Sequence, residues 1–168
     1  MIKDVLLLTV FPAAMAFAAA TDLFTMTVPN RIAIALVAGF FLLAPIVGLG
    51  WSDIGIHILV ALLALIVAFG LFSRGWIGGG DAKLFAATTL WFGHETLLTY
   101  GVYTALIGGV LTLAVLFLRR MPLPGVLWSQ GWLVRLHDAK EGVPYGIALA
   151  AGGLLVYPQT PFMAALGG

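Results

Sequence analysis

The feature that most limits how this chain can fold is its series of long apolar runs, which only short polar segments interrupt. Only 9% of its residues are charged, whereas soluble domains carry roughly 25%. So few charged side chains cannot give a folded domain a water-facing surface of ordinary polarity. The sequence therefore predicts an integral membrane protein, in which residues 1–168 form one all-α bundle of membrane-spanning helices.

The charged residues divide the chain into six candidate spans. A helix needs about 20 apolar residues to cross the hydrocarbon layer, and the fourth candidate provides only about 18 Å of helix. We keep it separate from the fifth because Gly93, His94 and Glu95 form a polar break. The expected spans cover residues 4–25, 32–50, 54–73, 80–93, 96–118 and 142–158.

The basic residues support this division. If the N-terminus lies outside, only Lys3 faces outside, and the other seven of the eight basic residues face inside. An excess of Lys and Arg in cytoplasmic segments is typical of membrane proteins. We therefore predict an external N-terminus, with these residues on the inner side: Arg31, Arg74, Lys83, Arg119, Arg120, Arg135 and Lys140.

Residues 121–141 connect the fifth and sixth expected spans. Pro122 and Pro124 end the preceding helix, and Trp128 and Trp132 follow four positions apart. This pattern predicts a short helix in the inner membrane interface. An irregular loop anchored by the two tryptophans explains the pattern equally well.

Small residues recur every four positions in the last two spans. They are Gly101, Ala105 and Gly109 in the fifth span, and two pairs in the sixth, Gly146 with Ala150 and Ala148 with Gly152. Such spacing lets helix backbones approach closely in lipid. We therefore expect these faces to pack within the bundle.

Two of the seven acidic residues, Asp22 and Asp81, are expected at a similar depth in the membrane and on the same side of it. Asp22 lies near the inner end of the first span, and Asp81 begins the fourth. A charged side chain within a span costs about 2.5–3.5 kcal/mol, so such residues usually face the bundle interior and carry function. Either one alone could be a helix-end residue that reaches the interface, but their shared depth favours a functional pair.

Two facing carboxylates in a confined site can perform aspartic protease chemistry. Because like charges repel at short range, the pair holds one proton. The ionised member takes a proton from water, and the protonated member polarises the peptide carbonyl and helps the amine leave. Glycines 78–80 before Asp81 permit a turn and close approach of an extended substrate, or they form a simple helix-breaking loop.

Three segments together resemble a known family. GGGDAKL, residues 78–84, resembles the Gly-x-Gly-Asp signature of intramembrane aspartyl proteases, in the version found in type IV prepilin peptidases. TDLFTMTVPN, residues 21–30, is similar to the family's other aspartate motif, and GVPYGIALAAGG, residues 142–153, to its last-span segment. The three segments follow the family's order and extend over nearly the whole chain.

The resemblance implies a six-span peptidase of the bacterial cytoplasmic membrane. Its partners would be the bilayer and prepilin or pseudopilin substrates, whose leader is cut at the cytoplasmic face. Asp22 and Asp81 would be the catalytic pair, and no metal or other cofactor is expected. Residues that match the family motifs without an assigned chemical step are Gly78, Gly80, Lys83, Pro29, Asn30, Pro144 and Gly146.

One departure from the family pattern is informative. Longer members carry a cytoplasmic insertion with paired Cys-x-x-Cys motifs and also methylate the new pilin N-terminus. This chain has no cysteine. It resembles the short, peptidase-only form that serves Flp-type pili, and we expect no N-methylation.

Other functions leave weaker signals. In a small transporter or channel subunit, Asp22 and Asp81 would be ion or proton ligands, but no internal repeat is visible. A second alternative is an inactive scaffold that binds pilins without cutting them, and the sequence does not distinguish it from an active peptidase.

Signals for other kinds of protein are weaker. HETLL resembles the start of a zinc-protease motif, but Leu98 replaces the second histidine. A net charge of +1 gives no indication of a nucleic-acid partner.

Overall fold

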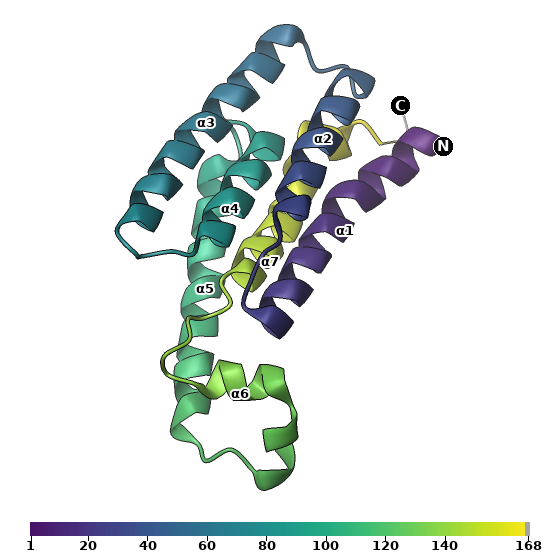
Figure 1. Cartoon of the computed structure of the whole chain (residues 1–168). Coiled ribbons are helices and arrows are strands. Elements are labelled where there is room, and N and C mark those ends of the chain that lie inside the picture. Colours follow the sequence, from purple (N-terminus) through teal and green to yellow (C-terminus); the bar gives the residue numbers. More distant parts are fainter. Residues whose placement is uncertain (167–168) are drawn as a thin grey trace.

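The computed structural model describes residues 1–166, and over that range it is helical with no strand (Figure 1). Six helices form the bundle, and shorter helical segments lie in the connections and near the C-terminus. The bundle helices are α1 (Ile2–Thr25), α2 (Asn30–Ile46), α3 (Trp51–Ser73), α4 (Gly79–Phe92), α5 (Leu97–Arg120) and α7 (Gly146–Val156). The remaining segments are η1 (Gly125–Ser129), α6 (Gly131–His137), η2 (Tyr157–Gln159) and α8 (Pro161–Ala164).

The helix lengths bear on the expected number of spans. Among the described residues, α1, α3 and α5 are long and apolar enough to cross a membrane. The helices α2, α4 and α7 occupy the other three expected positions but have 17, 14 and 11 residues. These lengths correspond to about 25, 21 and 17 Å of helix, less than the roughly 30 Å of a hydrocarbon layer. The helices indicate an integral membrane protein with three full-length candidate spans.

The break between α4 and α5 lies where the polar residues predicted it. Gly93 ends α4 with a backbone φ of 60°, a conformation that side chains with a Cβ rarely adopt. Its N–H donates to the carbonyl of Thr89, which closes the last turn. The chain then reverses into α5, so the fourth and fifth helices are separate and antiparallel (Figure 1).

The short helix α4 lies at the centre of the bundle and contacts α2, α3, α5 and α7. Trp91 near its end is fully buried, and the indole Nε1 donates to the carbonyl of Leu36 at 3.0 Å. The Trp91 ring also packs against Phe11 and Phe162, with ring centroids 5.2 and 4.7 Å away. Protein therefore surrounds most of α4, and this helix does not need the length of a lipid-exposed span.

The prediction that the fifth span packs through Gly101, Ala105 and Gly109 was wrong, because the buried face of α5 is displaced by about one residue. A Cβ on Gly109 would meet nothing within 4 Å, and the same holds for Gly101, so these glycines do not contact a neighbouring helix. Thr104 and Gly108 are buried instead. A Cβ on Gly152 of α7 would lie 3.1 Å from the backbone nitrogen of Thr104, so the close approach uses the adjacent face of α5.

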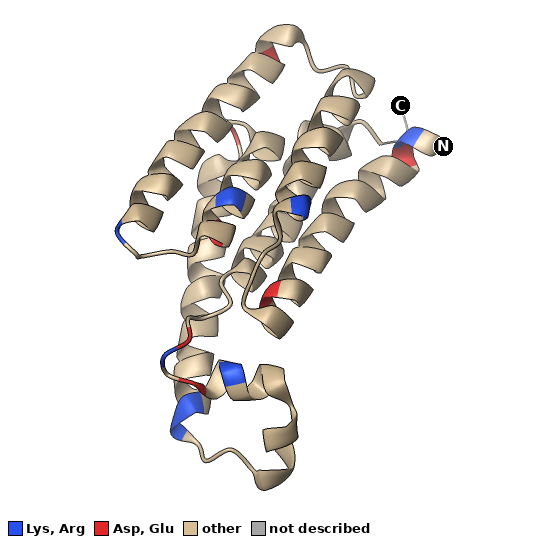
Figure 2. Cartoon of the chain, in the orientation of Figure 1, with Lys and Arg blue, Asp and Glu red and all other residues tan. Residues whose placement is uncertain are grey.

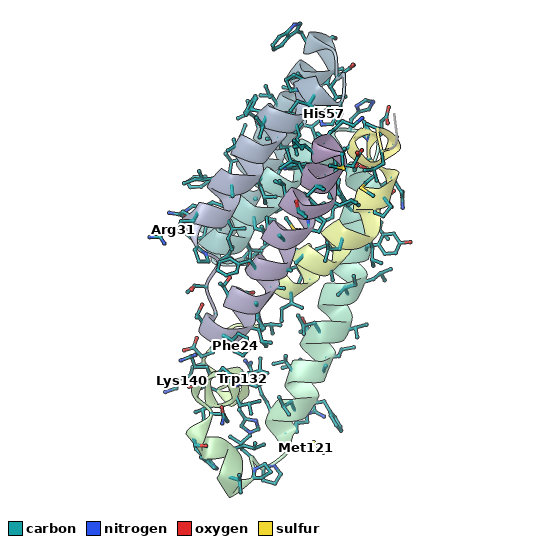
Figure 3. All side chains as sticks on the ribbon, turned by 90° about the vertical axis from the view of Figure 1, so that its right-hand side faces the viewer. Phe24, Arg31, His57, Met121, Trp132 and Lys140 are labelled. Carbon is teal, nitrogen blue, oxygen red and sulfur yellow. The ribbon has the colours of Figure 1, made fainter. Side chains whose placement is uncertain are left out.

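The connection 121–141 forms η1 and α6, so a short helix is present rather than an irregular loop. The helix α6 lies across one end of the bundle, beyond the end of α1 (Figure 1). The Trp132 ring meets the Phe24 ring of α1 edge-on at 5.7 Å (Figure 3). The Arg119 guanidinium holds the connection, because it donates to the carbonyls of Leu136 at 2.9 Å and Gly142 at 2.8 Å.

Candidate active site

Asp22 and Asp81 line one pocket of about 320 Å³. The pocket lies at the end of the bundle where α1 finishes and α4 begins, and Figure 2 shows an acidic segment on each of these two helix ends. Two residues 59 positions apart are therefore brought to one site. The pocket also contains Gly78, Gly80 and Lys83, so it unites all five expected site residues.

The Asp22 side chain is held by the last bundle helix. It lies on the final turn of α1, is only 4% exposed, and accepts a hydrogen bond from the Gly146 backbone N–H at 2.7 Å. Gly146 is the first residue of α7, and the N–H groups at a helix N-terminus have no partner within the helix. The partial positive charge of that helix end favours a nearby carboxylate.

Gly146 has no room for a side chain. A Cβ at this position would lie 2.8 Å from Asp22 Oδ2 and 3.0 Å from Asp22 Cβ. The family resemblance matched Gly146 by residue type, but reasoning from the sequence assigned it no contact. Its function as a partner of Asp22 was missed, because a backbone donor has no side-chain signature.

Asp81 lies in the first turn of α4 and folds back over the glycine segment. A Cβ on Gly78 would lie 3.0 Å from Asp81 Oδ2. A Cβ on Gly80 would lie 3.2 Å from the backbone nitrogen of Val28 and 3.3 Å from its carbonyl oxygen. Gly80 thus lets the start of α4 pack directly against the segment that joins α1 to α2, which forms another wall of the pocket.

Lys83 joins two walls of the site. Its Nζ donates to Asn30 Oδ1 at 3.0 Å, which connects α4 to the first residue of α2. Lys83 is two positions from Asp81, about 200° around a helix, so the two side chains point in different directions, and Asn30 is the partner of the amine. Within residues 1–166, no three His, Cys, Asp or Glu side chains are grouped as metal ligands.

Comparisons with known proteins identify the family. A family model described as the type IV leader peptidase family matches residues 9–113. The chain is also 28% identical over 151 residues to the prepilin leader peptidase/N-methyltransferase of Bacillus subtilis (strain 168). That alignment covers 88% of this chain and 53% of the relative, so the chain spans about half the relative's length. No solved structure matches the chain.

The family model covers both aspartates, the glycine segment and Lys83, and it extends over more than half of the chain. The residues that it matches also include three of the six bundle helices in full, α2, α3 and α4, and most of α1 and α5. On this evidence, the chain belongs to the type IV leader peptidase family.

Proposed function

We propose that this chain is an aspartic endopeptidase of the bacterial cytoplasmic membrane that removes the leader peptide from prepilins. The observation that supports the proposal most directly is that Asp22 and Asp81 line the same pocket. Membership of the leader peptidase family supports the reaction class. The same membership does not favour the alternative of a small transporter or channel subunit.

In the proposed mechanism, the two carboxyl groups share one proton and act on opposite sides of the scissile peptide bond. The ionised aspartate removes a proton from a water molecule, whose oxygen attacks the carbonyl carbon. The protonated aspartate donates its proton to the carbonyl oxygen, which gives a tetrahedral intermediate. The carboxyl group that took the proton from water then protonates the amide nitrogen, and the other carboxylate takes a proton from a hydroxyl group of the intermediate. The C–N bond breaks, a carboxylic acid and an amine are released, and the pair again holds one proton.

The substrate class follows from the sequence rather than from the pocket. The chain lacks the cysteines of the longer family members, so we assign it to the peptidase-only form that acts on Flp-type prepilins without N-methylation. We place the catalytic pocket at the cytoplasmic face, on the same side as residues 121–141. The position of α6 beyond the end of α1, the helix whose last turn carries Asp22, supports this placement (Figure 1).

The test is co-expression with an Flp-type prepilin, with loss of the leader followed on a gel. Asp22→Asn and Asp81→Asn should each lower cleavage by at least about 100-fold, because each removes one partner of the acid–base pair. Asp53→Asn is the matched control, since Asp53 is in the first turn of α3 at the other end of the bundle (Figure 1). Full activity in either active-site variant, at normal protein level, would rule out the mechanism.

A further inference from the structure

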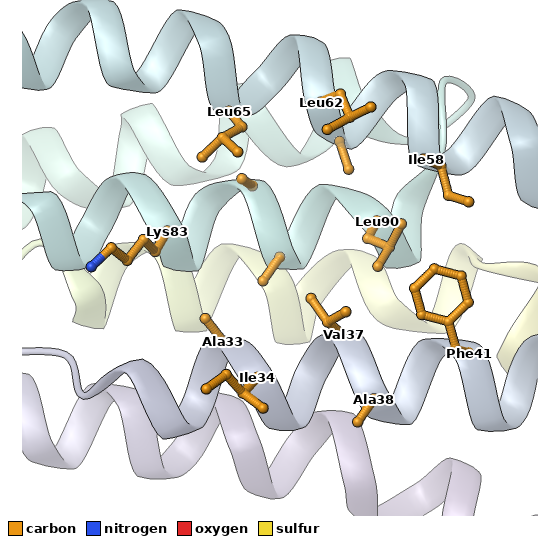
Figure 4. A pocket seen from close by; sticks show the side chains of 13 residues that line it. Ala33, Ile34, Val37, Ala38, Phe41, Ile58, Leu62, Leu65, Lys83 and Leu90 are labelled. Atoms are coloured by element: carbon orange, nitrogen blue, oxygen red, sulfur yellow. The ribbon is translucent and has the colours of Figure 1, made fainter.

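A second, apolar surface begins beside the catalytic pocket. The helices α2, α3 and α4 enclose an open groove of about 510 Å³ (Figure 4). Apolar side chains line all of it except at Lys83. Both α2 and α3 pack on α4, and the groove lies between them over one face of α4. Alanines from all three helices keep it open: Ala33, Ala61, Ala86 and Ala87.

The groove adjoins the catalytic pocket at Lys83, which lines both. Figure 4 shows Lys83 at one end of the groove, with Ile58 and Phe41 at the other. A chain that leaves the catalytic pocket on the side of Lys83 would therefore meet this end of the groove.

A second apolar groove provides an internal comparison. It has a volume of about 600 Å³ and lies on the other side of α3, between α3 and α5. None of the described residues that line it also lines the catalytic pocket. Of these two apolar grooves, only the one between α2 and α3 shares a lining residue with the pocket of Asp22 and Asp81.

The dimensions of the groove suit one face of a helix. The positions of α4 that line it are Lys83, Ala86, Ala87 and Leu90, which form one face over about 10 Å, or two helical turns. Alanine-lined surfaces let a second helix approach closely, and in hydrocarbon such van der Waals packing is a main source of helix association. A polar or extended segment would leave its backbone groups unpaired there, whereas a helix pairs them internally.

We propose that this groove binds an apolar helix of the substrate, and that this helix continues from the scissile bond into the membrane. The inference rests on the proposed peptidase function and adds to it a docking surface outside the catalytic pocket. The helix lies along α4 between α2 and α3, and the groove holds it while the residues at its end unwind between Asp22 and Asp81. Lys83 marks the boundary between the unwound and helical parts.

The first experiment fills the groove and compares two substrates. Ala33→Trp and Ala61→Trp replace partly exposed alanines of the groove, and Ala105→Trp fills the second groove as the matched control. One substrate is a full-length membrane precursor, and the other is a short soluble peptide that spans the cleavage site without the apolar helix. The groove variants should cleave the precursor at least 10-fold more slowly and the peptide within about twofold of the unmodified protein.

Each other result has a defined meaning. Unchanged precursor cleavage in both groove variants would overturn the docking site and would be expected if the groove holds only lipid. Equal loss on both substrates would also overturn it, because the substitutions would then act on catalysis or folding. If the unmodified protein cut neither substrate, the proposed peptidase function itself would be wrong.

The second experiment uses disulfide cross-linking, because the chain has no cysteine of its own. Leu62→Cys in the groove is combined with Asp22→Asn, which keeps the precursor uncut, and single cysteines are placed along the precursor helix. A disulfide requires Cα atoms within about 7 Å, so Leu62→Cys should cross-link to the precursor while Leu98→Cys in the second groove should not. A cross-link between two copies of this chain, or none to the precursor, would overturn the proposal.

Discussion

Asp22 shows how much of the environment of a proposed catalytic residue comes from distant parts of the chain. Its position at the end of an apolar run identified it as a candidate from sequence. Its hydrogen-bond partner, the backbone N–H of Gly146, is 124 residues away and belongs to another helix. A backbone donor can be supplied by any residue except proline, so no residue pattern connects the two positions.

A glycine substitution tests this contact. In Gly146→Ala, the new Cβ would lie 2.8 Å from Asp22 Oδ2, so the carboxylate must move. A displacement of about 1 Å at a reacting group can lower a rate about 100-fold, and we expect that loss in the cleavage rate. The measurement is the initial rate of leader removal from a prepilin at matched protein level.

The control for this prediction is Gly142→Ala in the same segment. A Cβ at Gly142 would meet nothing within 4 Å, so cleavage should stay near the normal rate. Equal rates in the Gly146 and Gly142 variants would show that the Asp22 position does not depend on a close approach of α7.

At the scale of helices, α4 shows why hydropathy alone did not settle whether the fourth candidate is a separate span. The sequence predicts a fourth span that is too short, and the structure gives α4 only 14 residues. Nine of these residues are buried, including both threonines at its centre, Thr88 and Thr89. Their hydroxyl groups donate to backbone carbonyls one turn earlier, so this largely enclosed helix keeps its polar groups satisfied.

The contact between α5 and α7 provides a prediction at this scale. Gly152→Ala would place a Cβ 2.5 Å from Thr104 Oγ1 and 3.1 Å from the Thr104 backbone nitrogen, so the two helices must separate. Overpacking of this kind costs about 1–3 kcal/mol, and we expect a lower thermal unfolding temperature in detergent.

The matched control is Gly109→Ala on α5, where a Cβ meets nothing within 4 Å. Alanine is a better helix former than glycine by about 1 kcal/mol, so this variant should be neutral or slightly more stable. A stability loss as large as that of Gly152→Ala would show that α5 packs through the face predicted from the small-residue spacing.

At the scale of the whole molecule, the distribution of basic residues predicts how the bundle is oriented in the membrane. Lys and Arg segments gather on the half of the bundle with α6 and the start of α4, apart from one near the N-terminus (Figure 2). The membrane rule for basic residues then predicts that this half faces the cytoplasm.

Thiol labelling in the cysteine-free chain can measure this orientation. Ser52→Cys lies at the start of α3 and Ser129→Cys at the end of η1, and both positions are exposed. A membrane-impermeant maleimide should label position 52 in intact cells, and position 129 only after the membrane is opened. Labelling of both positions in intact cells, or the reverse order, would contradict the predicted topology.

The amino-acid sequence by itself determined the helical class and the approximate helix limits. Hydropathy, glycine breaks and proline act over a few neighbouring residues, so the expected span 4–25 closely matches Ile2–Thr25. The sequence also identified Asp22 and Asp81, because a carboxyl group in an apolar run is rare enough to be noticed. The resemblance to the leader peptidases added the family, which the comparisons confirmed.

The tertiary structure alone decided which helix faces meet and which surfaces stay open. It showed that Thr104 and Gly108 of α5, rather than Gly101 and Gly109, face the bundle, and that Gly146 holds Asp22. It also showed that Lys83 lines both the pocket of Asp22 and Asp81 and the groove between α2 and α3. The physical reason is that every face of these helices is apolar, so hydropathy does not distinguish lipid from protein neighbours, and only shape complementarity between helices does.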